Sequence, residues 1–142
     1  MAIYNTNRAG IAKWLPDSSG VNVVGIYTFP ASGAAVLNAG DTFVGPSVAA
    51  NTWLVDFALD VDQLDTGGAI TLNVGWAASP AAIVSATTLA RTGGYLNSNT
   101  HGWLGTFFTV NTPIIATVAN GGSGAPLANA GVRMYVVYSA DA

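Results

Sequence analysis

The sequence predicts an all-β protein, an antiparallel β-sandwich with a jelly roll as the favoured topology. Two observations lead to this fold class. Several short segments alternate apolar and polar residues and are separated by turns rich in Gly, Asn and Pro, which is typical of sandwiches. Glutamate is absent and only 8% of the residues are charged, whereas exposed helices favour Glu and Lys.

The clearest strand covers residues 52–61, and a second strand follows at residues 70–76. In both, apolar residues alternate with polar or small ones, which predicts one face packed on a core. The residues predicted to face that core are Trp53, Val55, Phe57, Leu59, Val61, Ile70, Leu72, Val74 and Trp76. The glycines of Asp65-Thr66-Gly67-Gly68 favour a turn. We therefore expect the two strands to form a hairpin whose apolar sides share one core.

A short helix is predicted after Ser79. Serine is a frequent N-cap residue, and Pro80 suits the first helical position. The helix would run to about Ala90 and end near Gly93 and Gly94. Further strands are predicted at Val21–Phe29, Ala34–Leu37, Leu104–Val110, Pro113–Ala119 and Val132–Ser139.

The chain of 142 residues suits a single domain, and no linker or internal repeat divides it. Residues 1–20 follow neither the helical nor the strand period and close with turn residues at Pro16 and Ser18-Ser19-Gly20. We interpret this segment as an extended N-terminal arm, with a first edge strand of the sandwich as the alternative. Residues 21–142 are expected to form the single β-sandwich domain.

The low charge content indicates a chain that packs against other proteins. Apolar residues make up 51% of the sequence and the net charge is only -3, so repulsion between copies is weak. A soluble monomer with a surface of Thr, Asn, Ser and Gly is the alternative. The absence of a Lys/Arg cluster argues against nucleic acid as a partner. No apolar stretch reaches the length of a membrane-spanning helix, so no membrane contact is predicted.

Four aspartates are candidates for a cation site or a pair of catalytic carboxylates: Asp56, Asp60, Asp62 and Asp65. Their spacing lacks the sixth-position glycine and the closing glutamate of an EF-hand calcium loop. A flat, solvated strand also offers no pocket that would raise the pKa of one carboxyl group, as a glycosidase requires. Asp56, Asp60 and Asp62 share one parity, and we interpret them as the polar face of a strand that leads into the turn at Asp65.

The sequence predicts no catalytic, metal or cofactor site. His101 is the only histidine and could serve in a Ser-His-Asp triad, but no serine lies in a Gly-x-Ser-x-Gly motif. The chain has no Cys and no Glu, which leaves few of the usual metal ligands. The runs of glycine lack the spacing that binds phosphate, and they are interpreted as turns or flexible loops.

The four tryptophans fall into two groups. Trp53 and Trp76 lie on the apolar faces of predicted strands, where a core position is the better interpretation. Trp14 and Trp103 lie in irregular segments and could be exposed. Such rings either stack on sugars or anchor protein interfaces, so a carbohydrate-binding module is a competing hypothesis.

Three motifs follow one another in the middle of the chain. Leu64-Asp65-Thr66-Gly67 leads into an alternating strand that closes at Gly75, Ser79-Pro80-Ala81-Ala82 follows, and Thr92-Gly93-Gly94 forms a turn. With the final strand, Val132–Tyr138, this series resembles small head proteins of tailed phages. The resemblance covers roughly residues 51–95 and the last strand.

The resemblance implies a non-enzymatic virion structural protein, namely a capsid decoration (cement) protein on the outer capsid surface. Such a protein would bridge subunits of the major capsid protein and form a homo-oligomer, with a trimer favoured. An extended arm suits this role because it can add strand-to-sheet hydrogen bonds on a neighbour. The candidate partner-binding residues in the arm and one loop are Tyr4, Arg8, Lys13, Trp14 and Trp103. A carbohydrate- or receptor-binding β-sandwich module of a phage tail or fibre is the alternative.

Overall fold

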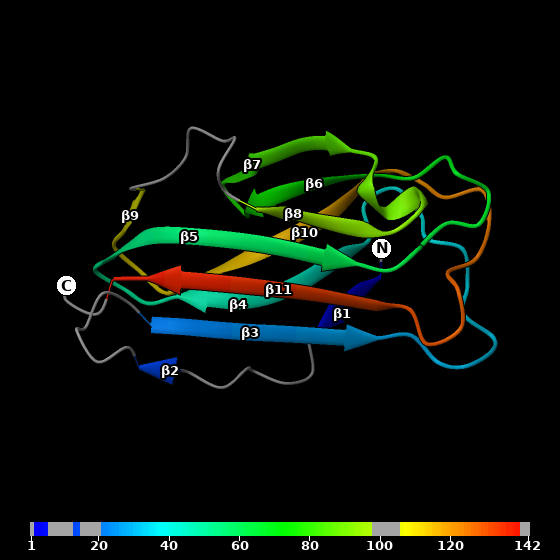
Figure 1. The fold of residues 1–142 in the computed structure, drawn as a ribbon. Coiled ribbons are helices and arrows are strands. Elements are labelled where there is room, and N and C mark those ends of the chain that lie inside the picture. The colour runs from blue at the N-terminus through cyan, green and yellow to red at the C-terminus, as the bar shows by residue number, and fades with distance from the viewer. Residues whose placement is uncertain (1, 6–12, 15–20, 98–105, 140–142) are drawn as a thin grey trace.

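The computed structural model describes residues 2–5, 13–14, 21–97 and 106–139, and within these ranges the chain is a β-sandwich (Figure 1). One five-stranded sheet has the order β1-β4-β10-β6-β7. Its strands are β1 (Ile3–Asn5), β4 (Thr42–Val48), β10 (Thr112–Asn120), β6 (Thr71–Trp76) and β7 (Ser79–Thr87). The all-β fold class is confirmed.

The second sheet has six strands, five of which follow the order β2-β3-β11-β5-β8, while β9 pairs with the start of β5. The strands are β2 (Lys13–Trp14), β3 (Val21–Thr28), β11 (Gly131–Tyr138), β5 (Thr52–Val61), β8 (Gly94–Asn97) and β9 (Phe107–Phe108). Pairing in the described ranges is antiparallel except between β1 and β4, which run parallel. From β3 to β6, successive strands alternate between the two sheets, which is compatible with a jelly roll. The jelly-roll topology itself stays a prediction.

One apolar core fills the space between the sheets. Its largest fully buried side chains are Phe43, Phe57, Leu37, Leu54, Leu59, Leu64, Ile70, Leu72, Ile114, Met134, Val48 and Val61. Strands from both sheets contribute because their inward residues alternate with outward ones. The strands predicted over residues 21–29, 113–119 and 132–139 are confirmed as β3, β10 and β11.

The predicted hairpin between residues 52–61 and 70–76 is wrong. β5 pairs with β11 and β8 in one sheet, whereas β6 pairs with β10 and β7 in the other. The loop between them crosses from sheet to sheet instead of turning back beside β5. Alternation reports that one face of a strand is buried, but it does not report which strand lies alongside. The apolar sides of β5 and β6 do share one core, as predicted.

The predicted inward face of β5 is correct only for its second half. Phe57, Leu59 and Val61 are buried, but Trp53 is 48% exposed and Val55 is 42% exposed. The register with β11 skips one residue, since Val137 lies opposite Asp56 and Tyr138 opposite Leu54. This β-bulge changes which side chains point inward, so the expected core position of Trp53 is wrong.

The predicted helix from Pro80 to Ala90 is also wrong in most of its length. Residues 79–87 form strand β7, which pairs with β6, and only Leu89–Arg91 forms a 3-10 turn, η1. Val84 and Thr87 are β-branched and favour a strand, and Pro80 is tolerated because β7 is an edge strand. Pairing with β6 therefore outweighs the local capping signal at Ser79.

Two further strand predictions need correction. Ala34–Leu37 forms no strand, although Leu37 is fully buried in the core. The segment predicted at 104–110 forms only β9, and its first two residues lie outside the described ranges. In contrast, β4 was not predicted, because Gly45 and Pro46 interrupt its alternation.

Candidate interaction surfaces

The N-terminal candidates lie at the edges of the two sheets. Tyr4 is in β1 at the edge of the five-stranded sheet, and Lys13 and Trp14 form β2 at the edge of the other. Strands β1 and β2 therefore each pair at the edge of a sheet. The division of the chain into an arm and a body stays a prediction. Arg8, Trp103 and His101 lie outside the described residues.

Tyr4 packs inside the chain against three other aromatic rings. Its ring centroid lies 5.0 Å from that of Phe43 in a stacked arrangement and 5.1 Å from that of Tyr27 in an edge contact. Phe29 completes the cluster at 5.5 Å. Burial, and next the charge of Asp41, raise the pKa of the Tyr4 hydroxyl. This ring holds β1 against the sandwich.

Asp65 is fully buried and organises the loops at the end of the sandwich that carries η1 (Figure 1). Its carboxylate accepts backbone N–H groups from Gly67, Ala69, Ile70, Ser123 and Gly124. Burial alone would raise the pKa of Asp65, but these hydrogen bonds outweigh it and hold the pKa well below its usual range. A carboxylate so occupied is a structural group rather than a cation ligand.

Glycines allow the two loops around Asp65 to approach each other. A Cβ atom on Gly67 would lie 2.9 Å from the backbone carbon of Ser123, and one on Gly124 would lie 2.7 Å from the Gly67 nitrogen. The run at residues 121–124, predicted as a turn or flexible loop, is therefore fixed by packing and by Asp65.

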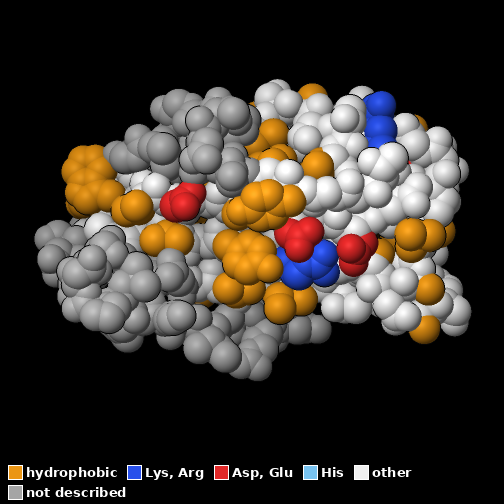
Figure 2. Space-filling model, viewed as in Figure 1, with side chains coloured by type: hydrophobic (Ala, Val, Ile, Leu, Met, Phe, Trp, Pro, Cys, Tyr) orange, Lys and Arg blue, Asp and Glu red, His pale blue; other side chains and the backbone are white. Residues whose placement is uncertain are grey.

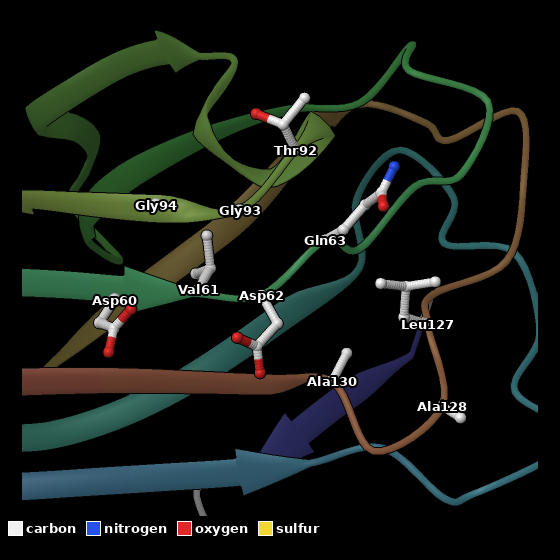
Figure 3. A pocket seen from close by; sticks show the side chains of 10 residues that line it. All are labelled: Asp60, Val61, Asp62, Gln63, Thr92, Gly93, Gly94, Leu127, Ala128 and Ala130. Carbon is white, nitrogen blue, oxygen red and sulfur yellow. The ribbon is translucent and has the colours of Figure 1, made fainter.

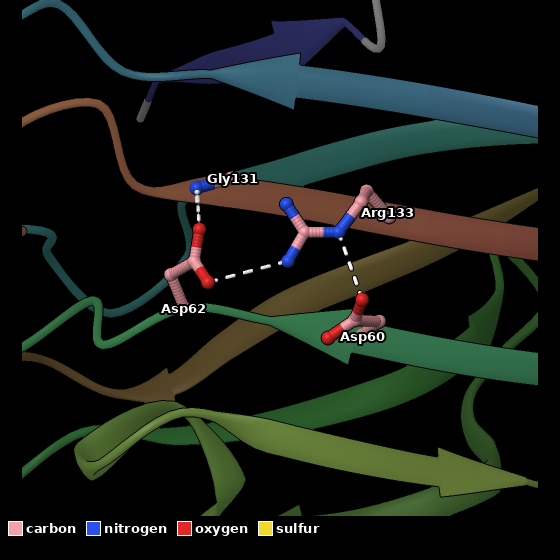
Figure 4. A network of polar contacts seen from close by, with 4 residues as sticks. All are labelled: Asp60, Asp62, Gly131 and Arg133. Carbon is pink, nitrogen blue, oxygen red and sulfur yellow. Dashed lines mark hydrogen bonds and ion pairs between the residues drawn. The ribbon is translucent and has the colours of Figure 1, made fainter.

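Asp60 and Asp62 lie on the outer side of the six-stranded sheet, as the polar face predicted for this strand requires. Both pair with Arg133 of β11: its Nε lies 2.9 Å from Asp60 Oδ2 and its Nη2 lies 3.3 Å from Asp62 Oδ1 (Figure 4). The second oxygen of Asp62 accepts the N–H of Gly131 at 2.8 Å. The bond from Gly131, and next that from Arg133, lower the pKa of Asp62. The bond to Asp60 contributes most to raising the pKa of Arg133.

The pairing of Arg133 with these aspartates was not predicted from the sequence. Arg133 is 73 residues from Asp60, so no local motif joins them. A signal was available, because Arg133 is one of only four basic residues and has the outward parity of its strand. Asp56 is placed apart from this network, and its Oδ1 accepts the N–H of Phe57.

A cavity of about 390 Å³ adjoins the ion pairs, between the end of β5, the turn at residues 92–94 and the loop at 127–130 (Figure 3). Asp60, Asp62, Gln63, Thr92 and Leu127 line part of it. Within the described ranges, no group of three His, Asp or Glu side chains is placed to hold a metal ion.

The same face of the six-stranded sheet carries apolar side chains around the ion pairs. The register places Ile26, Arg133, Asp60 and Tyr95 in one row across β3, β11, β5 and β8. We name the apolar residues on this side the sheet-face patch: Val24, Ile26, Tyr95, Tyr135 and Val137. Figure 2 shows apolar side chains gathered beside paired charges on this face. Within this patch Ile26 and Tyr95 are exposed, whereas Val24, Tyr135 and Val137 are half-buried.

A second apolar surface lies at the end of the sandwich opposite η1, where β9 meets the start of β5 (Figure 1). We name it the aromatic end: Trp53, Trp76, Phe107, Phe108 and Val110. The rings of Trp53 and Phe107 lie 4.9 Å apart, and those of Trp76 and Phe108 also lie 4.9 Å apart. A cavity of about 400 Å³ opens between residues 76–78 and 107–113.

This surface was not predicted from the sequence, because the alternation of β5 favours a core position for Trp53. The available signal was the uncharged stretch from Thr92 to Val132, in which Phe107, Phe108 and Val110 follow one another closely.

Two solved structures share this fold over nearly the whole chain. A chain in the capsid of Ralstonia phage GP4 superposes with a TM-score of 0.69 and 24% identity, covering 97% of both chains. A chain in the capsid asymmetric unit of cyanophage Pam1 superposes with a TM-score of 0.64 and 27% identity, covering 93% of this chain and 94% of its own. The chain has the fold of a phage capsid chain.

The likeness to capsid chains lies in the three-dimensional structure. No family model matches the sequence, and no curated protein matches it. Among the described residues, no helix is long and apolar enough to cross a membrane.

Proposed function

We propose that this protein is a non-enzymatic structural component of a phage capsid, and specifically a decoration protein on the outer surface of the shell. In this role it binds subunits of the major capsid protein and bridges neighbouring ones. The observation that carries the proposal is the likeness to chains of two phage capsids over more than nine tenths of this chain.

The surface chemistry supports this role. Only 8% of the residues are charged, and the described part of the chain exposes large apolar side chains at both the aromatic end and the sheet-face patch. Such surfaces are typical of protein interfaces, since apolar area is removed from water without leaving charges unpaired. On a shell with many identical sites, modest affinity at each contact suffices once copies are linked in an oligomer.

We further propose that the protein acts as a homotrimer and that its N-terminal residues take part in binding. Tyr4, Lys13 and Trp14 lie in edge strands, and an edge strand can continue a sheet onto a neighbouring subunit. Arg8 and Trp103 remain candidates for the same role.

Co-sedimentation of the purified protein with undecorated shells, assembled from the major capsid protein of the same phage, tests the proposal. We expect saturable binding to shells and much weaker binding to free capsid subunits, because bridging requires assembled neighbours. Sedimentation equilibrium of the protein alone tests the trimer. Absence of co-sedimentation in low and high salt would refute the decoration role.

A carbohydrate- or receptor-binding module of a phage tail or fibre is the second candidate. It is favoured by the exposed indole of Trp53, which lies tilted at 57° against the ring of Phe107, while Trp53 is 48% exposed. Exposed indoles can stack on sugar rings. A glycan array distinguishes the two functions, since the decoration role predicts no specific glycan.

A further inference from the structure

We propose that the aromatic end is the surface that docks on the capsid shell, and that it receives an uncharged, apolar cluster of side chains from a capsid subunit. This inference rests on the proposed function and adds to it the docking surface and the chemistry of the partner site. Four observations on the aromatic end carry it: exposure, shape, rigidity and charge.

The exposure of this end is high for apolar residues. Trp53 is 48% exposed, Phe107 is 41% exposed and Val110 is 64% exposed. Aromatic residues that stay accessible in a cluster are typical anchors of protein interfaces. Each of the three therefore has apolar area to bury on a partner.

The shape of the end is concave. The cavity of about 400 Å³ is lined by Trp76, Ala77, Ala78, Phe107 and Val110 among others. Phe108 stands edge-on to Trp76, with 4.9 Å between ring centroids and an interplanar angle of 87°. The buried ring of Phe108 and the half-buried ring of Trp76 form part of the cavity wall. A side chain that enters the cavity would therefore contact apolar groups.

The loops that form the end are held by hydrogen bonds. Ala50 donates its N–H to Asn111 Oδ1 at 2.8 Å, and Asn51 donates its N–H to the Phe108 carbonyl at 2.7 Å. The Thr112 hydroxyl donates to the Val110 carbonyl at 2.8 Å. A surface already fixed in its conformation loses little entropy when it binds, which favours docking without rearrangement.

The absence of charged residues in the segments that form the aromatic end indicates what kind of partner group binds there. The segments that build the end, residues 46–53, 75–80 and 106–113, contain no charged residue. A charged partner group would lose its hydration here and would find no counter-charge in these three segments, so an apolar group is favoured. The cavity is lined mostly by rings, alanines and aliphatic groups, and its polar side chains are Thr109, Asn111 and Thr112. Asn111 Oδ1 already accepts from Ala50 and the Thr112 hydroxyl already donates to Val110, so an apolar occupant is favoured over a sugar. The sheet-face patch differs, because it surrounds the charges of Asp60, Asp62 and Arg133.

The test compares three variants in the shell co-sedimentation assay. Val110→Asp places a carboxylate at the mouth of the cavity, Val110→Leu keeps the site apolar, and Leu127→Asp adds the same charge at the opposite end. Leu127 is a matched control because it is 45% exposed. We expect Val110→Asp to weaken shell binding by about 100-fold or more, since a buried unpaired charge is strongly unfavourable. The other two variants should bind as the parent does, and thermal unfolding should show that all three are folded.

The outcomes separate this inference from the proposed function. If the parent protein does not bind shells, the proposed function fails regardless of the variants. If the parent binds and Val110→Asp binds equally well, or if only Leu127→Asp loses binding, the decoration role stands and the aromatic end is not the docking surface. If Val110→Asp instead dissociates the free oligomer, the end is an interface between copies. If free sugars compete with shell binding, the occupant is a glycan. Either of these last two results overturns the inference.

Discussion

Arg133 Nε lies 2.9 Å from Asp60 Oδ2, across adjacent strands that are 73 residues apart in the sequence. The two residues are direct register partners in β11 and β5. Asp62 joins the same guanidinium through its Oδ1 atom at 3.3 Å. One of only four basic residues in the chain thus pairs two carboxylates on a sheet face that also carries the sheet-face patch and, further along β5, the exposed Asp56.

Replacing this arginine gives a first prediction. Arg133→Met should lower the free energy of unfolding by about 1 kcal/mol, because the paired side chains are partly exposed and water screens them. The loss should shrink in high salt. Urea unfolding at two salt concentrations measures both effects. Arg91→Met is the control, since Arg91 donates to the carbonyls of Ile70 and Ala69 and its loss should depend little on salt.

Removing the Asp65 carboxylate should destabilise the protein far more. Asp65→Ala leaves five backbone N–H groups without their acceptor, and we expect a loss of about 3–5 kcal/mol. Asp65→Asn keeps one acceptor oxygen and should lose less. Asp56→Asn, on an exposed strand position, should change stability by less than about 1 kcal/mol. Chemical denaturation measures all three, and equal losses at positions 56 and 65 would contradict the central role of Asp65.

The same carboxylate predicts how stability depends on pH. The pKa of Asp65 is lower in the folded protein than the value of about 3.9 in an unfolded chain. The folded state therefore binds fewer protons, and the stabilisation is present above about pH 4 and is lost as pH falls towards the folded pKa. Unfolding free energies measured between about pH 6 and pH 2.5 should decline with acidification. Asp65→Asn should remove much of this slope, and an unchanged slope would show that other groups carry it.

Tyr4 gives a prediction about the N-terminal strand. Tyr4→Ala removes the ring stacked on Phe43 and should lower the free energy of unfolding by about 1–3 kcal/mol. Tyr4→Phe keeps the ring and should change it by less than about 1 kcal/mol. Shell binding of the Phe variant then shows whether the hydroxyl itself contacts a partner. Reduced binding at unchanged stability would assign it that role.

The positions of the strands were largely predictable from the sequence, whereas the strands with which each one pairs were not. Alternation at residues 21–29 and 132–139 reports half-burial, which is a local property of each strand. The pairing of β5 with β11 depends on contacts between residues more than 70 positions apart, and local turn residues at 65–68 suggested a hairpin instead. Ser79 and Pro80 gave a helical capping signal that pairing with β6 overrode.

The interaction surfaces were harder to predict than the fold for a related reason. Trp53 is exposed because a bulge near Val55 changes which side chains of β5 point inward. No single residue type in the sequence indicates a bulge. Asp65 looked like the first residue of a turn after an acidic strand face, yet its hydrogen-bond donors Ser123 and Gly124 come from a loop 58 and 59 residues away. The absence of charge around Phe107 was visible in the sequence, but its position beside Trp53 was not.

The bulge in β5 also separates two kinds of evolutionary constraint within one strand. Beyond it, Phe57, Leu59 and Val61 are buried in the core, so substitutions there affect the whole fold. Before it, Trp53 and Val55 face outward, whereas Leu54 between them is fully buried, so only the outward positions are outside the core. Substitutions at these two outward positions can therefore follow changes in a partner, while the buried positions of the same strand are constrained by the fold.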